Sequence, residues 1–153
     1  MSTDLQTARP ALGSRAQAHP RAAEHDHHLI RDAIREASVR GTIAVGLAAV
    51  AVIHAVDSVG KWSEVRYLFW MYMALIVASL ATAAAVLFSR SRATFLAAAG
   101  LCAAVIAGYV LNRTVGLPQA HDDIGNWTEP LGLASLVVEG SVLVLALAAF
   151  ARR

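Results

Sequence analysis

The stretch YLFWMYMALIVASLATAAAVLF, residues 67–88, contains no Asp, Glu, Lys, Arg or His. A helix of about 20 apolar residues is long enough to cross the roughly 30 Å hydrocarbon core of a bilayer. A helix of a soluble bundle usually has one polar face towards water, and this stretch has none. We therefore interpret it as a membrane-spanning helix.

Three further apolar stretches of similar length surround it. The whole chain of 153 residues is 57% hydrophobic and 16% charged, whereas a soluble domain has about 45–50% apolar and roughly 25% charged residues. We predict an all-α fold, an integral membrane antiparallel four-helix bundle over residues 41–153. The predicted spans are residues 41–60, 66–88, 93–112 and 130–150.

The first 40 residues have a different composition. Residues 1–24 have few large apolar side chains, which predicts a disordered cytoplasmic arm. Residues 25–40 place Leu29, Ile30 and Ile34 at helical spacing between charged residues. This pattern predicts a juxtamembrane amphipathic helix that lies on the inner leaflet and runs into the first span.

Basic residues are distributed unequally between the two ends of the predicted bundle. Seven lie at the end that holds both termini and three at the other, which predicts a multi-pass plasma-membrane protein with cytoplasmic N- and C-termini. We interpret these residues as topology signals and lipid-headgroup contacts. No basic stripe is interleaved with aromatic residues, so no nucleic-acid partner is predicted. The seven are Arg31, Arg35, Arg40, Arg90, Arg92, Arg152 and Arg153, and the three are Lys61, Arg66 and Arg113.

Glu139 is the only charged residue of the fourth predicted span, and helical rise places it roughly 13 Å from the outer end of that span. A carboxylate at that depth is costly unless it is paired, protonated or hydrated. Two interpretations are open. Glu139 is either an intramembrane proton or cation site, or a protonated residue whose interhelical hydrogen bond holds the bundle together. Ser135 lies one turn away on the same face.

His54 and Asp57 lie three residues apart near the outer end of the first predicted span, so their side chains share a helix face. Imidazole is a common ligand of Zn, Cu and Fe, and the carboxylate could ligate the metal or orient the ring. The alternative is an interfacial histidine bonded to a backbone carbonyl. A bis-histidine haem is less favoured, because no second histidine lies within a predicted span.

The loop between the third and fourth spans reads RTVGLPQAHDDIGNWTEP, residues 113–130. Charged residues alone would indicate a solvated loop, but the apolar residues among them predict a folded lid that packs onto the outer end of the bundle. Thr128 or Asn126 is expected to cap the helix that follows. The predicted metal ligands are His54, Asp57, His121, Asp122 and Asp123, and the charge-balancing or lid residues are Arg113, Glu129 and Trp127.

Two functions are compatible with these patterns. The first is an outward-facing polar site for a metal ion (Cu, Zn or Fe) or for protons, formed by the outer helix ends and the 113–130 loop. The second is a non-catalytic accessory or assembly subunit that docks through that loop onto a larger membrane complex or a second copy. The chain has no Gly-rich phosphate loop, C-x-x-C pair or G-x-S-x-G elbow, which argues against an enzyme.

Several segments resemble an uncharacterised group of small four-span integral membrane proteins of high-GC Gram-positive bacteria. These are IHAVD (53–57), YLFWMYMA (67–74), RTVGLP (113–118) and EPLGLASLVVEG (129–140), within residues 43–140. The resemblance implies the four-span topology and no activity. It also points to particular residues as important, namely His54, Arg113, Glu129 and Glu139.

Overall fold

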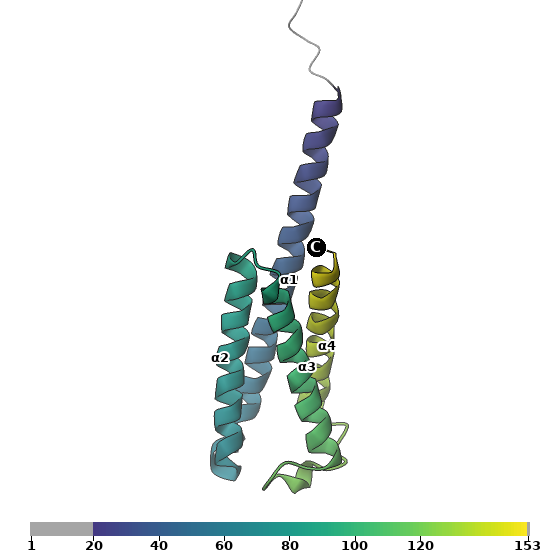
Figure 1. Ribbon diagram of the computed structural model, residues 1–153. Helices are drawn as coiled ribbons and strands as arrows, with labels where there is room; N and C mark the ends of the chain where they lie inside the picture. The colour runs from purple at the N-terminus through teal and green to yellow at the C-terminus, as the bar shows by residue number, and fades with distance from the viewer. Residues whose placement is uncertain (1–19, 153) are drawn as a thin grey trace, which may run out of the picture. The chain divides into compact units, whose positions relative to one another are not determined.

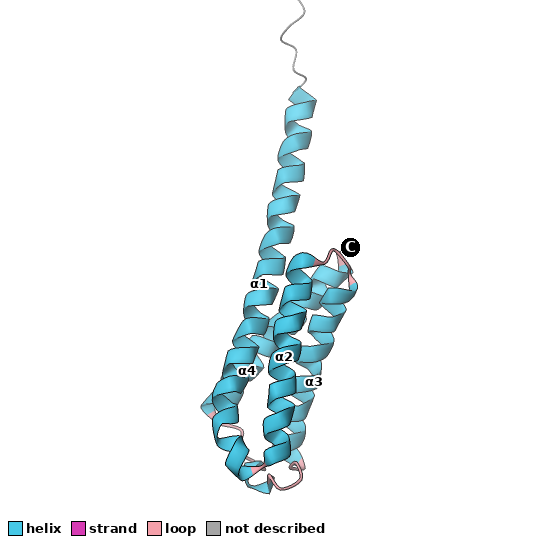
Figure 2. Cartoon of the chain, turned by 90° about the vertical axis from the view of Figure 1, so that its left-hand side faces the viewer, coloured by secondary structure: helices cyan, strands magenta, loops and turns pink. Residues whose placement is uncertain are grey.

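The computed structural model describes residues 20–152, with side chains from His27 onward, and the regular secondary structure in that range is helical. The elements are α1 (Pro20–Glu64), α2 (Arg66–Phe88), α3 (Ala93–Thr114), the short 3₁₀ helix η1 (His121–Asp123) and α4 (Pro130–Ala151). All four α-helices are long and apolar enough to cross a membrane. They form an antiparallel bundle (Figure 1, Figure 2), which confirms the predicted four-helix membrane fold.

The described chain divides after Glu36 into two compact units, of which the second is the bundle. Residues 20–24, which we predicted as part of a disordered arm, belong to helix α1. Residues 1–19 of that predicted arm lie outside the described residues. In the first unit, Leu29 and Ile34 are mostly exposed, and their predicted contact with the inner leaflet stays a prediction.

The last three predicted spans agree closely with the helices: α2 has the predicted bounds, whereas α3 ends two residues later and α4 one residue later. The predicted cap of α4 was wrong. Glu129 is the N-cap, with Pro130 in the first turn, and its side chain accepts a hydrogen bond from the Gly132 N–H at 3.1 Å. A carboxylate is favoured there because it faces the positive end of the helix dipole.

We call the end of the bundle where α1 and α3 end and α2 and α4 begin the loop end. The hydrophobic core fills the other half of the bundle, where small and medium side chains from all four helices pack together. Its largest buried members are Phe95, Ile43, Leu47, Val86 and Cys102.

Helices α1 and α4 approach each other closely within this core. A Cβ atom at Gly46 would collide with Cγ2 of Val142, which is itself only 2% exposed. Small residues at such crossings let helix backbones pack closely in membranes, where dispersion replaces the hydrophobic effect as the main attraction between helices. The α1–α4 crossing therefore depends on the absence of a side chain at position 46.

Arg40 has a different role from the headgroup contact that we predicted. It is only 8% exposed, and its Nη1 donates hydrogen bonds to the carbonyl oxygens of Val86 at 2.6 Å and Ser89 at 2.7 Å. The last carbonyls of a helix have no partner within the helix, so Arg40 supplies hydrogen bonds that α2 cannot make itself. Its positive charge also complements the negative end of the helix dipole. The guanidinium lies 5.1 Å from the centre of the Phe95 ring, so Arg40 fastens α1 to the α2–α3 connection.

Replacement of Gly46 by Leu is expected to destabilise the bundle by roughly 1–3 kcal/mol, the usual cost of overpacking. Gly100→Leu is the matched control, since a Cβ at this helical glycine would meet no atom within 4 Å. Thermal unfolding of both variants in the same detergent measures the difference. Equal unfolding temperatures would refute the close α1–α4 crossing.

Candidate functional site

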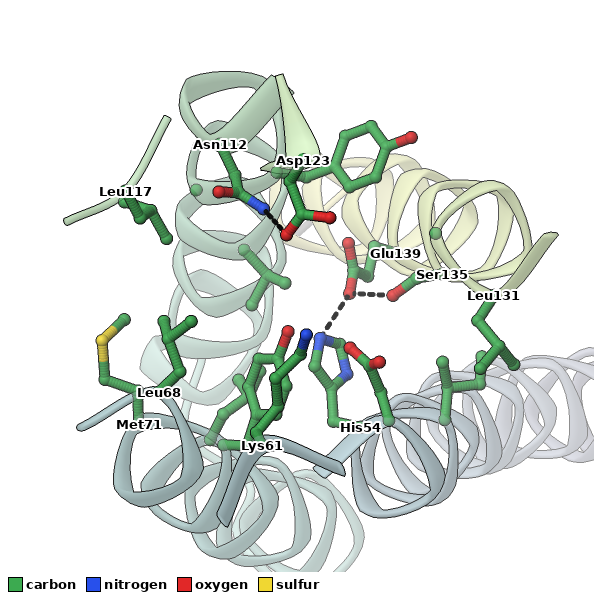
Figure 3. A pocket seen from close by; sticks show the side chains of 18 of the residues that line it. His54, Lys61, Leu68, Met71, Asn112, Leu117, Asp123, Leu131, Ser135 and Glu139 are labelled. Atoms are coloured by element: carbon green, nitrogen blue, oxygen red, sulfur yellow. Dashed lines mark hydrogen bonds and ion pairs between the residues drawn. The ribbon is translucent and has the colours of Figure 1, made fainter. Parts of the chain in front are cut away.

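A cavity of about 460 Å³ occupies the loop-end half of the bundle. All four helices and the α3–α4 loop contribute to its wall (Figure 3), and each contributes at least one polar side chain. Residues of the 113–130 segment line the cavity at the loop end, and the hydrophobic core closes its opposite end. The polar residues that line it are His54, Asp57, Lys61, Tyr72, Tyr109, Asn112, Arg113, Asp123, Glu129, Ser135 and Glu139.

Glu139 lies at the inner end of this cavity and is only 1% exposed. Its Oε1 accepts a hydrogen bond from the Ser135 hydroxyl at 2.7 Å and lies 3.9 Å from Nε2 of His54 (Figure 3). Its Oε2 is buried and has no hydrogen-bond partner among residues 27–152. One carboxyl oxygen is therefore satisfied and the other is available for a proton or a ligand.

His54 is oriented by its own helix. Its Nδ1 lies 2.9 Å from the carbonyl oxygen of Val50, one turn earlier. A carbonyl can only accept, so Nδ1 carries a hydrogen in both the neutral and the charged ring. The neutral ring then presents the lone pair of Nε2 to Glu139, and the ring edge packs against Tyr72 with centroids 5.4 Å apart.

The geometry of this pair limits its protonation states. If His54 is neutral and Glu139 ionised, two lone pairs face each other in a buried place, which is unfavourable. A single added proton removes the conflict, on either the carboxyl or the imidazole. In either case the added hydrogen can lie between Nε2 of His54 and Oε1 of Glu139, which are 3.9 Å apart.

Arg113 organises the rim of the cavity, although its side chain is only 5% exposed. Its Nη1 donates to Oδ1 of Asp123 at 2.8 Å, and its Nη2 donates to Oε2 of Glu129 at 2.9 Å. Asn112 donates a further hydrogen bond to Oδ2 of Asp123 at 2.9 Å. Charge-assisted hydrogen bonds of this kind are among the stronger ones in proteins, and they join the end of α3 to the loop and to the start of α4.

Partial burial opposes ionisation of Asp123, but the Asn112 hydrogen bond and the Arg113 charge outweigh it and hold the pKa of this carboxyl below its usual 3.8. Asp123 is therefore ionised at neutral pH. Arg113 is paired with both Asp123 and Glu129, and its charge-balancing role stays a prediction.

The rest of the loop is fixed by its backbone and by two tyrosines. Gly116 and Gly125 have φ values of +80° and +78°, a conformation that side chains disfavour. Tyr67 donates a hydrogen bond to the carbonyl oxygen of Pro118 at 2.7 Å. Tyr109 packs edge-on against Trp127, with ring centroids 6.1 Å apart, so the loop is attached to both α2 and α3.

The structure brings together only part of the predicted metal site. His54, Asp57 and Asp123 line the cavity, whereas His121 and Asp122 are exposed and do not. In the described range, no three His, Cys, Asp or Glu side chains are grouped so that they could hold a metal ion. Two cavity residues were missed from the sequence: Tyr72, and Lys61, which we interpreted as a topology signal. The available signal was helical spacing. Lys61 lies four residues after Asp57, and Tyr72 lies four residues after Leu68, so each shares a helix face with another lining residue.

No protein-family model matches the chain, and searches of curated proteins and of solved structures found no match. The resemblance to small four-span membrane proteins stays a prediction. Fold and site together define a small multi-pass membrane protein with a buried His–Glu pair at the inner end of a polar cavity.

Replacement of Asp123 by Asn is expected to lower the unfolding temperature at neutral pH, because Arg113 loses a charged partner. The difference from the wild type should shrink as the pH falls. A carboxyl with a lowered pKa stabilises the fold above its unfolded pKa, near 3.8, and this stabilisation is lost as the pH falls through the folded pKa.

Asp122→Asn is the matched control, because Asp122 is the exposed neighbour. Thermal unfolding of both variants and the wild type between neutral pH and about one unit below the ordinary aspartate pKa measures the effect. A constant difference between Asp123→Asn and the wild type across that range would contradict the ion pair.

Proposed function

We propose that this protein is a plasma-membrane protein with cytoplasmic termini, whose loop end faces outward and whose cavity takes up protons at the His54–Glu139 pair. The positive-inside bias of seven basic residues against three supports this orientation. The observation that carries the proposal is the burial of Glu139 beside a histidine whose free ring nitrogen faces it.

The depth of the pair supports a role within the membrane. Glu139 lies nine residues after the start of α4, and His54 lies ten residues before the end of α1. In antiparallel helices these distances place both groups at a similar depth, roughly 13–15 Å from the loop end. Ionisable groups at such depth are rare in membrane proteins and usually mark ion or proton pathways.

Polar groups at several levels support entry of protons from the loop end. Asp123 and Lys61 line the cavity near the rim, and Asp57 lies one helical turn closer to the loop end than His54. Tyr72 from α2 and Cys102 from α3 are the other titratable groups near the pair. A chain of polar side chains or waters through this space would connect the rim with Glu139.

A Cu, Zn or Fe ion is the alternative occupant of the same place. Such ions take at least three protein ligands in most sites, and His54 with Glu139 supplies two. Asp57 is the nearest further candidate on α1, so a metal would require this carboxylate to turn towards the pair. The geometry favours a proton over a metal.

The second candidate function is that of an accessory subunit. Trp62 and Trp70 are 50% and 59% exposed and pack edge-on with Phe69 at the loop end. Exposed tryptophans serve either as interfacial anchors in a membrane or as contact points for a partner protein. Loss of a co-purifying protein from Trp62→Ala, with an intact His54–Glu139 pair, would favour this function.

Infrared titration of the protein in nanodiscs tests the proton site. We expect a carboxylic acid C=O band from Glu139 that titrates with pH, is lost in Glu139→Gln and titrates over a different pH range in His54→Ala. Glu129→Gln is the matched control, because it removes a carboxyl that is paired with Arg113 and leaves the His54–Glu139 pair in place, so the Glu139 band should persist.

The same samples test the metal alternative. Stoichiometric binding of Zn²⁺ or Cu²⁺ that is lost in His54→Ala would replace the proton by a metal ion. An identical infrared titration in wild type and Glu139→Gln would overturn the proton site.

A further inference from the structure

The cavity is much larger than a proton site requires. Its volume of about 460 Å³ falls within the roughly 300–1,000 Å³ of sites that bind small organic molecules. Its two sides also differ in chemistry. The side formed by α1 and α4 carries the carboxyls of Asp57 and Glu139. The side formed by α2 and α3 contributes Tyr72, Tyr109, Asn112 and Arg113 and is otherwise apolar, with Leu68, Met71, Leu75, Leu101, Ala104, Val105 and Gly108.

The charges on the lining leave an anionic excess. Four carboxyl groups face the cavity against one lysine and one arginine. Arg113 is occupied by Asp123 and Glu129, and Lys61 pairs with Glu64, at 3.0 Å, outside the cavity.

Two carboxyls are compensated less directly: Asp57 is attracted by Lys61 without forming an ion pair with it, and the neighbour of Glu139 is His54. Asp57 and Glu139 form no ion pair with a lysine or arginine in the part of the chain that the structure describes. The Tyr72 side chain is close to the Asp57 carboxylate. Oε2 of Glu139 is buried without a partner there. A ligand with a cationic group would complement both carboxyls at once.

The apolar side of the cavity reaches the surface of the bundle between α2 and α3. Met71 and Ala104 both line the cavity and are both exposed, Met71 by 53%. The two helices converge at their connected ends and diverge towards the loop end (Figure 1). In a bilayer this surface faces lipid, so an apolar chain could extend from the cavity into the leaflet without being exposed to water.

We propose that the cavity binds an amphiphilic organic monocation of the alkylamine class. The ammonium group lies against Glu139 and Asp57, and the alkyl chain passes Leu68 and Met71 towards the α2–α3 surface. This rests on the proposed function, because the ammonium ion and the proton compete for the same carboxyl. Each cation that binds a protonated pair therefore releases one proton.

Three probes of equal chain length separate charge from hydrophobicity: hexylamine, hexanol and hexanoate. Calorimetric titration of the protein in nanodiscs, in two buffers of different protonation enthalpy, measures affinity and proton release together. We expect hexylamine to bind at least about tenfold more tightly than the other two, since a buried charge pair is worth more than one hydrogen bond. Glu139→Gln should lose this preference.

Gly108→Leu fills the cavity without changing the carboxyls. Gly108 lines the apolar side, and a Cβ atom there would meet no atom within 4 Å, so the leucine can enter the space without moving the backbone. Gly100→Leu is the matched control, because Gly100 also has open space and lies outside the cavity lining. We expect at least about tenfold weaker hexylamine binding in Gly108→Leu only, with the infrared band of Glu139 retained.

The outcomes separate the two proposals. Equal affinity for the three probes, or hexylamine binding unaffected by Gly108→Leu, would overturn the ligand proposal. If the Glu139 band still titrates in that case, the proton site stands without it. Absence of both the band and the hexylamine preference would overturn both. Unfolding temperatures of Gly108→Leu and Gly100→Leu within a few degrees of the wild type verify that the variants fold.

Discussion

The absence of water from a bilayer core is the constraint on which this structure depends. A polar group placed there must find its partners within the chain. Glu139 uses Ser135 and His54, and His54 in turn uses the carbonyl of Val50. At the loop end, two guanidinium nitrogens of Arg113 donate to carboxylates from the loop and from the start of α4. These residues form two local sets of polar contacts, and each set joins two helices.

The two halves of the bundle divide the structural tasks. Close packing around Gly46 and Phe95 holds the helices together at one end, whereas at the other end they enclose a cavity with a buried carboxyl. A cavity and an incompletely satisfied carboxyl both reduce stability. Close packing in the core half offsets this loss of stability. At the loop end, the Arg113 contacts hold α3, the loop and α4 together around the cavity.

The helices could be predicted from sequence because their determinants are local. The charge-free stretch at 67–88 fixed the bounds of α2, and the length of the apolar runs placed α3 and α4 within two residues. The importance of Glu139 was also evident, since a single carboxyl in a span is informative by itself. Its pairing with His54 was not predicted, because it depends on how α1 and α4 are rotated about their axes. The sequence grouped His54 with His121 and Asp122 instead, and the 3₁₀ turn places those two residues outside the cavity.

Arg40 shows how one residue can act at two stages in the life of a membrane protein. Its acceptors, the carbonyls of Val86 and Ser89, follow it by 46 and 49 residues, so α2 has not yet packed against α1 when Arg40 leaves the ribosome. At that time the guanidinium is available to the insertion machinery and to anionic lipids, and in the proposed orientation it helps to retain the N-terminus in the cytoplasm. Once α2 has packed against α1, the guanidinium is buried and donates hydrogen bonds to the carbonyls at the end of α2. In the proposed orientation Arg40 therefore acts first as a topology signal and later joins α1 to the end of α2.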